Sequence, residues 1–255
     1  MIPLTVGSLF SGIGGFEFGL ERTGGFKTVR QCEIDPFCLK VLEKHWPGVK
    51  RFADIKKMGI GEEIPYVDVI CGGFPCQDIS CAGKGAGIHA ERSGLWWEML
   101  RTVRLVRPKF VLVENVAALL NRGLDEVLGS LAESGYDAEW QVLSAKMFGG
   151  LHQRERTFVV AYPAGMSCNG SQDDDNLQSI RPTLWCIKPG RQVNFESIGS
   201  KTEPGRIIHE SSMGGMANGL PRRLHINRLH ALGNAIVPQC AEYVGRCVLA
   251  AEGHT

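Results

Sequence analysis

The sequence lacks a strong charge of either sign. Lys and Arg number 28 and Asp and Glu number 27, so the formal net charge is only +1. Proteins that hold nucleic acid through their overall charge usually show a basic surface or stripe. Composition alone therefore gives no sign of nucleic-acid binding, and any such function has to rest on particular sites.

Long apolar runs are also missing. The segment from Met1 to Leu9 has no basic region followed by an apolar run, which a secretory signal peptide would need. No stretch approaches the roughly 18 apolar residues of a membrane span. We therefore expect a cytoplasmic protein with no membrane association.

The cysteines follow no metal or disulfide pattern. There are nine, which cannot all pair within one chain, and they form neither repeated CxxC pairs nor a small disulfide framework. The sequence predicts reduced thiols and no metal site.

What is present fits one folded α/β domain with a small appendage: 255 residues, of which 44% are hydrophobic and 22% charged. Strand and helix signals alternate up to about residue 160. The predicted strands are 4–10, 27–33, 51–53, 67–71, 110–114, 138–145 and 156–162, and the predicted helices are 16–22, 36–45, 95–106 and 124–134. This order predicts a doubly wound, mostly parallel sheet whose last two strands form an antiparallel hairpin at the edge.

The chain changes character after Tyr162. Glycine, serine, asparagine and an acidic run at 173–175 dominate up to about Leu220, and regular signals return at 226–232 and in a final helix at 238–251. We expect a catalytic and cofactor-binding domain at 1–162, a small recognition region at 163–220, and a segment at 221–255 that returns to the first domain.

Residues that follow the parallel strands are candidates for a binding site, because ligands of open α/β sheets bind at the carboxyl ends of the strands. The glycine-rich segment 10–15 can bring backbone close to a ligand, and Glu33 can accept the hydroxyls of a ribose. The glycine spacing is not GxGxxG, and Glu17 suits a pyrophosphate poorly. A nucleoside without phosphates fits better. Asp54 is a candidate for an adenine amino group, although it can equally cap a helix that begins at Ile55.

Cys76 and Glu114 are the candidates for chemistry. Cys76 follows a strand and a glycine-proline turn, where backbone N–H groups can stabilise a thiolate. A small buried side chain is the alternative for any single cysteine, and it is the interpretation we keep for Cys71 and Cys81. Glu114 ends the next apolar strand, so a nucleophile and an acid are expected to share one crevice.

Eight short motifs carry a specific resemblance. In order they are FSGIGG (10–15), CEID (32–35), FAD (52–54), GGFPCQ (72–77), ERSGLW (91–96), ENV (114–116), QRER (153–156) and GNAIVPQ (233–239). This set resembles the ordered motifs of the DNA cytosine-5 methyltransferase family, and especially its short phage and prophage members. The resemblance covers about residues 6–162 and 220–250, and it implies a Rossmann-like fold that uses S-adenosylmethionine as methyl donor and no metal.

The resemblance also implies roles for individual residues. Cys76 adds to C6 of a cytosine flipped out of the duplex, Glu114 contacts N3 and the exocyclic amine, and Arg156 holds O2 with support from Arg154. The implied cofactor-binding residues are Phe10, Gly12, Gly14, Gly15, Glu33, Ile34, Asp54, Ile55, Pro75, Leu95, Asn234 and Ala235. The implied partner is double-stranded DNA, bound by a monomer in a bacterial or phage-infected cell, in a restriction-modification or phage self-protection context.

Two departures from the family pattern concern the second half of the chain. Leu151 and His152 stand where proline and glutamine are common, and region 163–220 is short for target recognition. The target sequence is therefore not predicted. Three alternatives remain: an RNA cytosine-5 methyltransferase, a relative that binds DNA without catalysis, and a nicotinamide-dependent dehydrogenase, which the glycine spacing disfavours.

Overall fold

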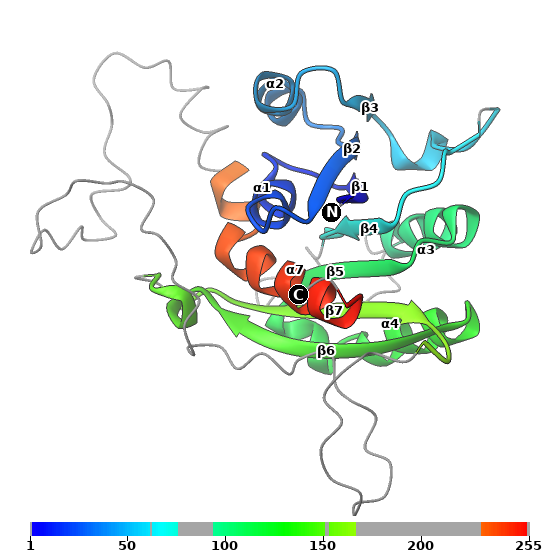
Figure 1. Cartoon of the computed structure of the whole chain (residues 1–255), viewed down its shortest axis with the longest axis vertical. Coiled ribbons are helices and arrows are strands. Elements are labelled where there is room, and N and C mark those ends of the chain that lie inside the picture. The colour runs from blue at the N-terminus through cyan, green and yellow to red at the C-terminus, as the bar shows by residue number, and fades with distance from the viewer. Residues whose placement is uncertain (1, 62, 76–93, 151–152, 167–230, 254–255) are drawn as a thin grey trace, which may run out of the picture.

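One sheet organises the computed structural model, which describes residues 2–61, 63–75, 94–150, 153–166 and 231–253. Its seven strands lie in the order β3-β2-β1-β4-β5-β7-β6 (Figure 1). The parallel strands are β1 (Leu4–Leu9), β2 (Phe26–Cys32), β3 (Lys50–Phe52), β4 (Val69–Gly72) and β5 (Phe110–Val116). The hairpin of β6 (Tyr136–Ser144) and β7 (Glu155–Pro163) is antiparallel, and β7 also pairs antiparallel with β5. The predicted fold class is confirmed.

Helices cover both faces of the sheet. On one face α1 (Gly15–Glu21) and α7 (Pro238–Ala251) pack over a cluster that includes Val6, Phe158 and Val160. On the other face α3 (Leu95–Val106) and α4 (Leu124–Glu133) pack over a cluster around Trp96 and Val113. Short 3-10 helices, η1 (Ile55–Lys57), η3 (Ala117–Asn121) and η4 (Ala145–Phe148), join the strands to these layers.

Local signals set the helix boundaries. In α2 (Pro36–His45), Asp35 is the N-cap, and its Oδ1 accepts from the backbone N–H groups of Phe37 and Cys38, both at 2.9 Å. Proline at the first helical position needs no intrahelical partner for its nitrogen. The predicted bounds of 36–45, 95–106 and 238–251 are those of α2, α3 and α7.

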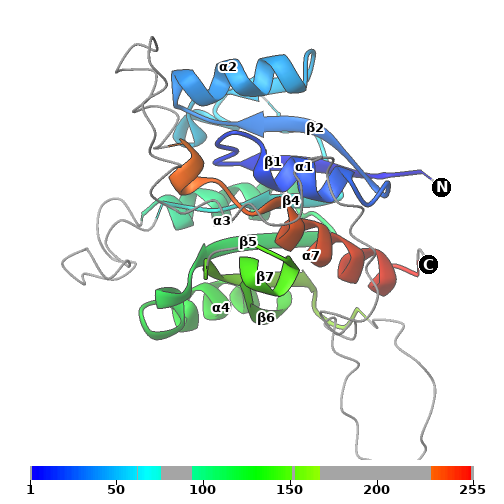
Figure 2. The same cartoon turned by 90° about the vertical axis from the view of Figure 1, so that its left-hand side faces the viewer.

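The last described helix, α7, packs against the first, α1. A Cβ at Gly19 in α1 would lie 2.3 Å from the carbonyl oxygen of Pro238, so only glycine allows this approach. Arg22 donates from Nε to the buried Glu242 at 2.9 Å, which adds an ion pair between α1 and α7. Figure 2 shows the two helices side by side.

The antiparallel strand β7 begins where the parallel strands end. In the register of β5 and β7, Val116 lies opposite Arg156 and Glu114 opposite Phe158. Strand β5 therefore runs two residues past its predicted end at Glu114, because β7 supplies a hydrogen-bonding partner there. This register brings the start of β7 to the carboxyl edge of the sheet, where the candidate residues were expected.

Several expected features lie outside the described residues: Cys76, Cys81, Leu151, His152, the acidic run 173–175, nearly all of region 163–220 and the segment 226–230. Among the described helices, none has the length and apolar character to cross a membrane. The described His, Cys, Asp and Glu residues likewise form no group of three that could hold a metal ion.

Candidate active site

A cavity of about 780 Å³ opens at the carboxyl edge of the sheet, and we call it the large cavity. It is lined by most of the residues that the sequence singled out: Phe10, Gly12, Glu33, Ile34, Asp54, Ile55, Pro75, Leu95, Glu114, Arg156 and Asn234. The cavity has further lining residues to which the sequence analysis assigned no role: Cys32, Asp35, Pro36, Cys38, Ala53, Lys56, Gly73, Phe74, Asn115, Val116 and Ala231. All of these except Cys38 and Ala231 lie within two residues of a predicted one, so their position beside the strand ends is the signal that could have found them.

Glu33 joins the loops after β1 and β2. Its Oε2 accepts from the N–H of Gly12 at 2.7 Å, and its Oε1 accepts from the N–H groups of Ile34 at 2.9 Å and Asp35 at 2.8 Å. A carboxylate offers about four lone-pair sites, and these three bonds leave about one of them for a ligand. Glu33 therefore shapes the rim of the cavity in addition to facing it.

The loop after β1 uses unusual backbone angles. Phe10 has a φ of 53° and Gly12 a φ of 55°, both in the left-handed region. That region is costly for a bulky side chain such as Phe10, and it persists only where surrounding contacts impose it. A Cβ at Gly12 would meet no atom within 4 Å, so this glycine is needed for its conformation and opens onto the cavity.

Asp54 caps η1. Its Oδ1 accepts from the N–H of Lys56 at 3.0 Å, which is the local role that the sequence left open for it. Asp54 also lines the large cavity, so the cap and a ligand contact are compatible.

Glu114 and Arg156 form an ion pair at the other end of the large cavity. Nε of Arg156 lies 3.0 Å from Oε1 of Glu114. Arg156 is two residues before Phe158, the strand partner of Glu114, so both side chains leave the sheet on one face. The ladder between β5 and β7 therefore sets this pairing.

Glu114 carries the most informative pKa of the site. Burial raises the pKa of its carboxyl from 4.5 to about 7, although the nearby positive charges of Arg156 and Arg154 lower it in part. Near neutral pH this group exists in both protonation states, so it can give or take a proton.

Gly73 makes room for that carboxyl. A Cβ at this position would lie 2.6 Å from Oε2 of Glu114, so any side chain would displace the carboxyl group. Two residues later Pro75 lines the large cavity, immediately before Cys76. The glycine of GGFPCQ thus has a steric reason that the sequence alone did not reveal.

Two cysteines missed by the sequence analysis, Cys32 and Cys38, also line the large cavity. Burial and the nearby carboxylate of Glu33 raise the pKa of each thiol to about 12. Both thiols therefore stay protonated at neutral pH and are poor nucleophiles.

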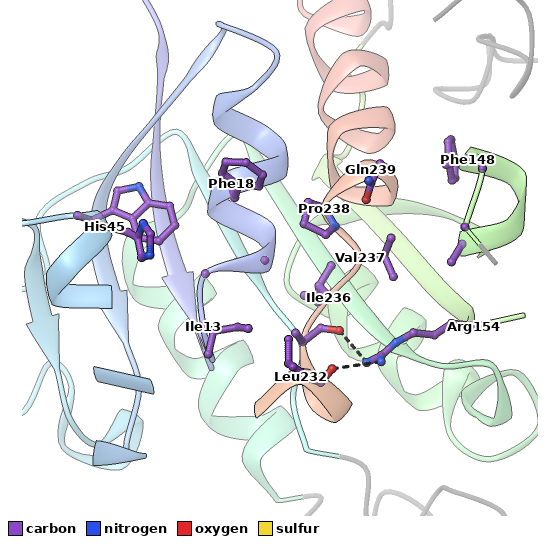
Figure 3. Close-up of a pocket in the computed structure, with 17 residues that line it drawn as sticks. Ile13, Phe18, His45, Phe148, Arg154, Leu232, Ile236, Val237, Pro238 and Gln239 are labelled. Atoms are coloured by element: carbon purple, nitrogen blue, oxygen red, sulfur yellow. Dashed lines mark hydrogen bonds between the residues drawn. The ribbon is translucent and has the colours of Figure 1, made fainter. Parts of the chain in front are cut away.

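Four of the predicted site residues do not line the large cavity: Gly14, Gly15, Arg154 and Ala235. They line a second cavity of about 570 Å³, which lies between α1, η4 and the segment 232–239 (Figure 3). The two glycines have packing reasons, because a Cβ at Gly14 would meet the Trp46 ring at 2.4 Å and a Cβ at Gly15 the carbonyl oxygen of Ile236 at 2.5 Å.

The lining of the large cavity defines the chemistry it can hold. Glu33, Asp35 and Asp54 gather at one end, which disfavours a phosphate-bearing ligand and suits hydroxyl, amino or cationic groups. The other end offers a carboxyl that titrates near neutrality beside a guanidinium. One cavity thus combines a polar binding end with a proton-transfer end.

Comparisons with known proteins identify Type II methyltransferases as relatives of this chain. The chain is 39% identical over 166 residues to the Type II methyltransferase M2.BsuMI of Bacillus subtilis (strain 168), which covers 62% of this chain and 42% of that protein. It is 36% identical over 189 residues to the Type II methylase M.HgiEI of Herpetosiphon aurantiacus, covering 69% and 42%. A crystal structure of a prophage-encoded protein from E. coli matches with a TM-score of 0.51 and 25% identity, over 66% of this chain and 49% of that one.

The chain thus spans about half the length of the relatives that it matches. A family model described as C-5 cytosine-specific DNA methylase matches residues 4–202. That range includes the parallel strands, the Glu114–Arg156 pair and the residues that line the large cavity, except Ala231 and Asn234. The chain belongs to the C-5 cytosine-specific DNA methylase family.

Proposed function

We propose that this protein transfers a methyl group from S-adenosylmethionine to C5 of a cytosine flipped out of double-stranded DNA. The observation that carries the proposal is the pairing of Arg156 with Glu114, a carboxyl of pKa about 7, in the cavity that Glu33 and Asp54 border. Family membership narrows the substrate to a cytosine and the product to its C5-methylated form.

The cytosine ring has to gain electron density at C5 before it can take a methyl group. The Cys76 thiolate forms a bond to C6. The electron pair of the C5–C6 double bond moves onto C5 and is shared through C4 with N3, where negative charge develops. Protonated Glu114 donates to N3 as that charge develops, while Arg156 donates to O2. Arg156 thereby has two partners, the Glu114 carboxylate before the base arrives and O2 afterwards.

Residues at the opposite end hold the methyl donor, which supplies an electrophilic methyl group on a sulfonium. Glu33 accepts one ribose hydroxyl with its remaining lone pair, Phe10 and Ile34 pack against the adenine, and Asp54 accepts from the adenine amino group. Gly12, Ile55, Pro75, Leu95 and Asn234 complete the wall. The acidic lining at this end suits a cation.

Product release restores the starting cysteine. When the electron pair at C5 bonds to the methyl group, the bond from that methyl group to the sulfonium breaks, S-adenosylhomocysteine leaves, and N3 returns its proton to Glu114. C5 then gives up its proton to a base, the C5–C6 double bond forms again, and the C6–S bond breaks to return the Cys76 thiolate. Gly14 and Gly15 support this site by allowing the close approach of Trp46 and Ile236, and Ala235 supports it because its carbonyl oxygen accepts from Arg154.

The biological setting is proposed by analogy with the Type II methyltransferases among the relatives. We propose that the chain acts as a monomer in the cytoplasm of a bacterial or phage-infected cell, in restriction-modification or self-protection. Region 163–220 serves as its recognition module between a catalytic domain at 1–162 and a returning segment at 221–255.

Incubation of the full chain with labelled S-adenosylmethionine and either duplex DNA or transfer RNA tests the proposal. We expect label at C5 of cytosine in the duplex, and none from a Cys76→Ser variant that folds and binds cofactor like the wild type. Label only in the RNA would favour the RNA-modifying alternative. Label in neither acceptor, from protein that binds the cofactor, would contradict the proposed transfer reaction.

A second substrate tests the covalent step. Duplex DNA that carries 5-fluorocytosine has no C5 proton to lose, so the adduct should accumulate as a protein–DNA band that survives denaturation. The band should be absent with Cys76→Ser and present with Cys81→Ser. Methyl transfer without any trapped band would argue against the adduct.

A further inference from the structure

Arg154 and Arg156 are two residues apart at the start of β7, and their guanidinium groups hold different parts of the site. Arg156 pairs with Glu114 in the large cavity. Arg154 instead donates to three backbone carbonyls of the returning segment, those of Gly233 and Ala235 at 2.7 Å each and that of Leu232 at 3.4 Å. Figure 3 shows the Arg154 side chain directed toward Leu232, and both residues line the second cavity.

The turn that Arg154 holds also forms part of the wall of the large cavity. Residues 231–234 form a helical turn, and Ala231 and Asn234 face the large cavity. The carbonyls of Leu232 and Gly233 belong to the end of this turn, where helical carbonyls favour a cation, and the Ala235 carbonyl follows the turn. The Leu232 carbonyl also accepts from the N–H of Ala235 at 3.3 Å. On its far side the segment is fixed to α1, since the Ile236 backbone packs directly on Gly15.

We propose that Arg154 is a positioning residue that fixes the 231–235 turn and thereby sets the affinity for the methyl donor through Asn234. This inference rests on the proposed function and assigns Arg154 a role away from the base. A planar guanidinium suits it, because one rigid fork can reach carbonyls in different directions, whereas an ammonium cannot reproduce that geometry.

Arg154 also acts on Glu114 through its charge. Its positive charge lowers the pKa of the Glu114 carboxyl, with the closer Arg156 as the larger influence. The fork and the charge can be separated experimentally, since Arg154→Lys keeps the charge and loses the fork, and Arg154→Gln loses both.

Calorimetric binding of S-adenosylhomocysteine without DNA is the first measurement. We expect both Arg154→Lys and Arg154→Gln to raise the Kd about tenfold, or about 1.4 kcal/mol. The matched control Lys146→Gln removes an exposed cation from the neighbouring η4 and should stay within about twofold of wild type. In a separate assay, kcat/KM for DNA should fall with rising pH as Glu114 loses its proton. The pH of this fall should be unchanged in Arg154→Lys, which keeps the charge, and higher in Arg154→Gln, because loss of the charge raises the pKa of Glu114.

Amide hydrogen exchange of the cofactor-free protein is the second measurement, and it does not depend on the proposed function. Amides in 233–237 should exchange about tenfold faster in both Arg154 variants than in Lys146→Gln, while amides of β5 stay protected. Unchanged exchange in a folded variant overturns the positioning role, even if the wild type binds no cofactor. Faster exchange with unchanged affinity overturns the link to cofactor binding.

Discussion

Nε of Arg156 lies 3.0 Å from Oε1 of Glu114, so a permanent cation contacts a carboxyl whose pKa is raised to about 7 by burial. The two effects oppose each other, because burial favours the protonated carboxyl and the guanidinium favours the carboxylate. Their balance leaves Glu114 able to donate a proton near neutral pH.

The pH dependence of kcat/KM for DNA should have a descending limb near pH 7. Glu114 acts in its protonated form, and that form is lost as the pH rises through its raised pKa, so the rate should fall up to about tenfold per pH unit above that point. Steady-state kinetics between about pH 6 and 9 measures the limb. Glu114→Gln should lower kcat/KM by about 10²- to 10⁴-fold and flatten the limb. A wild-type rate that rises throughout this range would rule out Glu114 as the acid.

Arg156→Gln should move the limb to higher pH. The guanidinium stabilises the carboxylate, so its removal raises the pKa of Glu114 further and extends the range in which the acid form persists. The same change removes a donor to O2 and should lower the maximal kcat/KM by on the order of 10²-fold. Arg122→Gln, in the loop after η3, serves as the comparison and should keep the wild-type limb. A shift of the limb to lower pH would contradict the assigned electrostatics.

Gly73→Ala should impair catalysis while leaving the fold intact. The new Cβ would lie 2.6 Å from Oε2 of Glu114, and the end of that side chain can move away more easily than backbone can. A displaced carboxyl no longer reaches N3, so kcat should fall by on the order of 10²-fold. Single-turnover methylation measures this, with circular dichroism to follow folding. Gly129→Ala is the matched control, because a Cβ there meets no atom within 4 Å, and it should methylate normally.

The sequence predicted the strand and helix order because apolar runs and helical spacing are local signals, and α2, α3 and α7 have the predicted bounds. It also predicted which loops carry the site, because parallel strands place their carboxyl ends together. The predicted end of β5 was two residues too early, because the additional pairing of β5 with β7 is a long-range contact. Local patterns do not report such a partner.

Contacts between distant segments explain the rest of what the sequence missed. Gly14 and Gly15 were predicted to bind the cofactor, which stays a prediction, and the sequence did not reveal that Trp46 and Ile236 also leave no room for a Cβ at these positions. Arg156 was predicted to hold O2 with support from Arg154, but the sequence did not reveal what Arg154 contacts, because the turn that it holds is about 80 residues further along the chain. A motif indicates the chemistry of its residues more readily than it indicates the distant neighbours that each of them contacts.

Glu33→Gln should weaken cofactor binding more than the loss of one charge implies. An amide has one oxygen and one NH₂ group, so the substituted group cannot accept from the N–H groups of Gly12, Ile34 and Asp35 as the carboxylate does. We expect the Kd for S-adenosylhomocysteine to rise about 10- to 100-fold by calorimetry. The exposed Glu63→Gln should bind like the wild type. Equal affinities for the two variants would show that the Glu33 bonds do not shape the site.

Gly19→Ala should destabilise the whole domain, because it separates the helices that join the two ends of the described chain. The added Cβ would lie 2.3 Å from the Pro238 oxygen and 2.6 Å from the Ala241 Cβ, and neither neighbour is the end of a flexible side chain. Overpacking of this kind costs about 1–3 kcal/mol, which outweighs the roughly 1 kcal/mol by which alanine favours a helix over glycine. Urea unfolding should therefore show a lower free energy of unfolding.

Gly129→Ala in α4 isolates the helix-propensity effect, since its Cβ would point into open space. That control should raise the free energy of unfolding by about 0.5–1 kcal/mol. If Gly19→Ala raised the free energy of unfolding to the same extent, α1 and α7 could move apart without a loss of stability. The close approach of Gly19 to Pro238 would then not be what holds the returning helix in place.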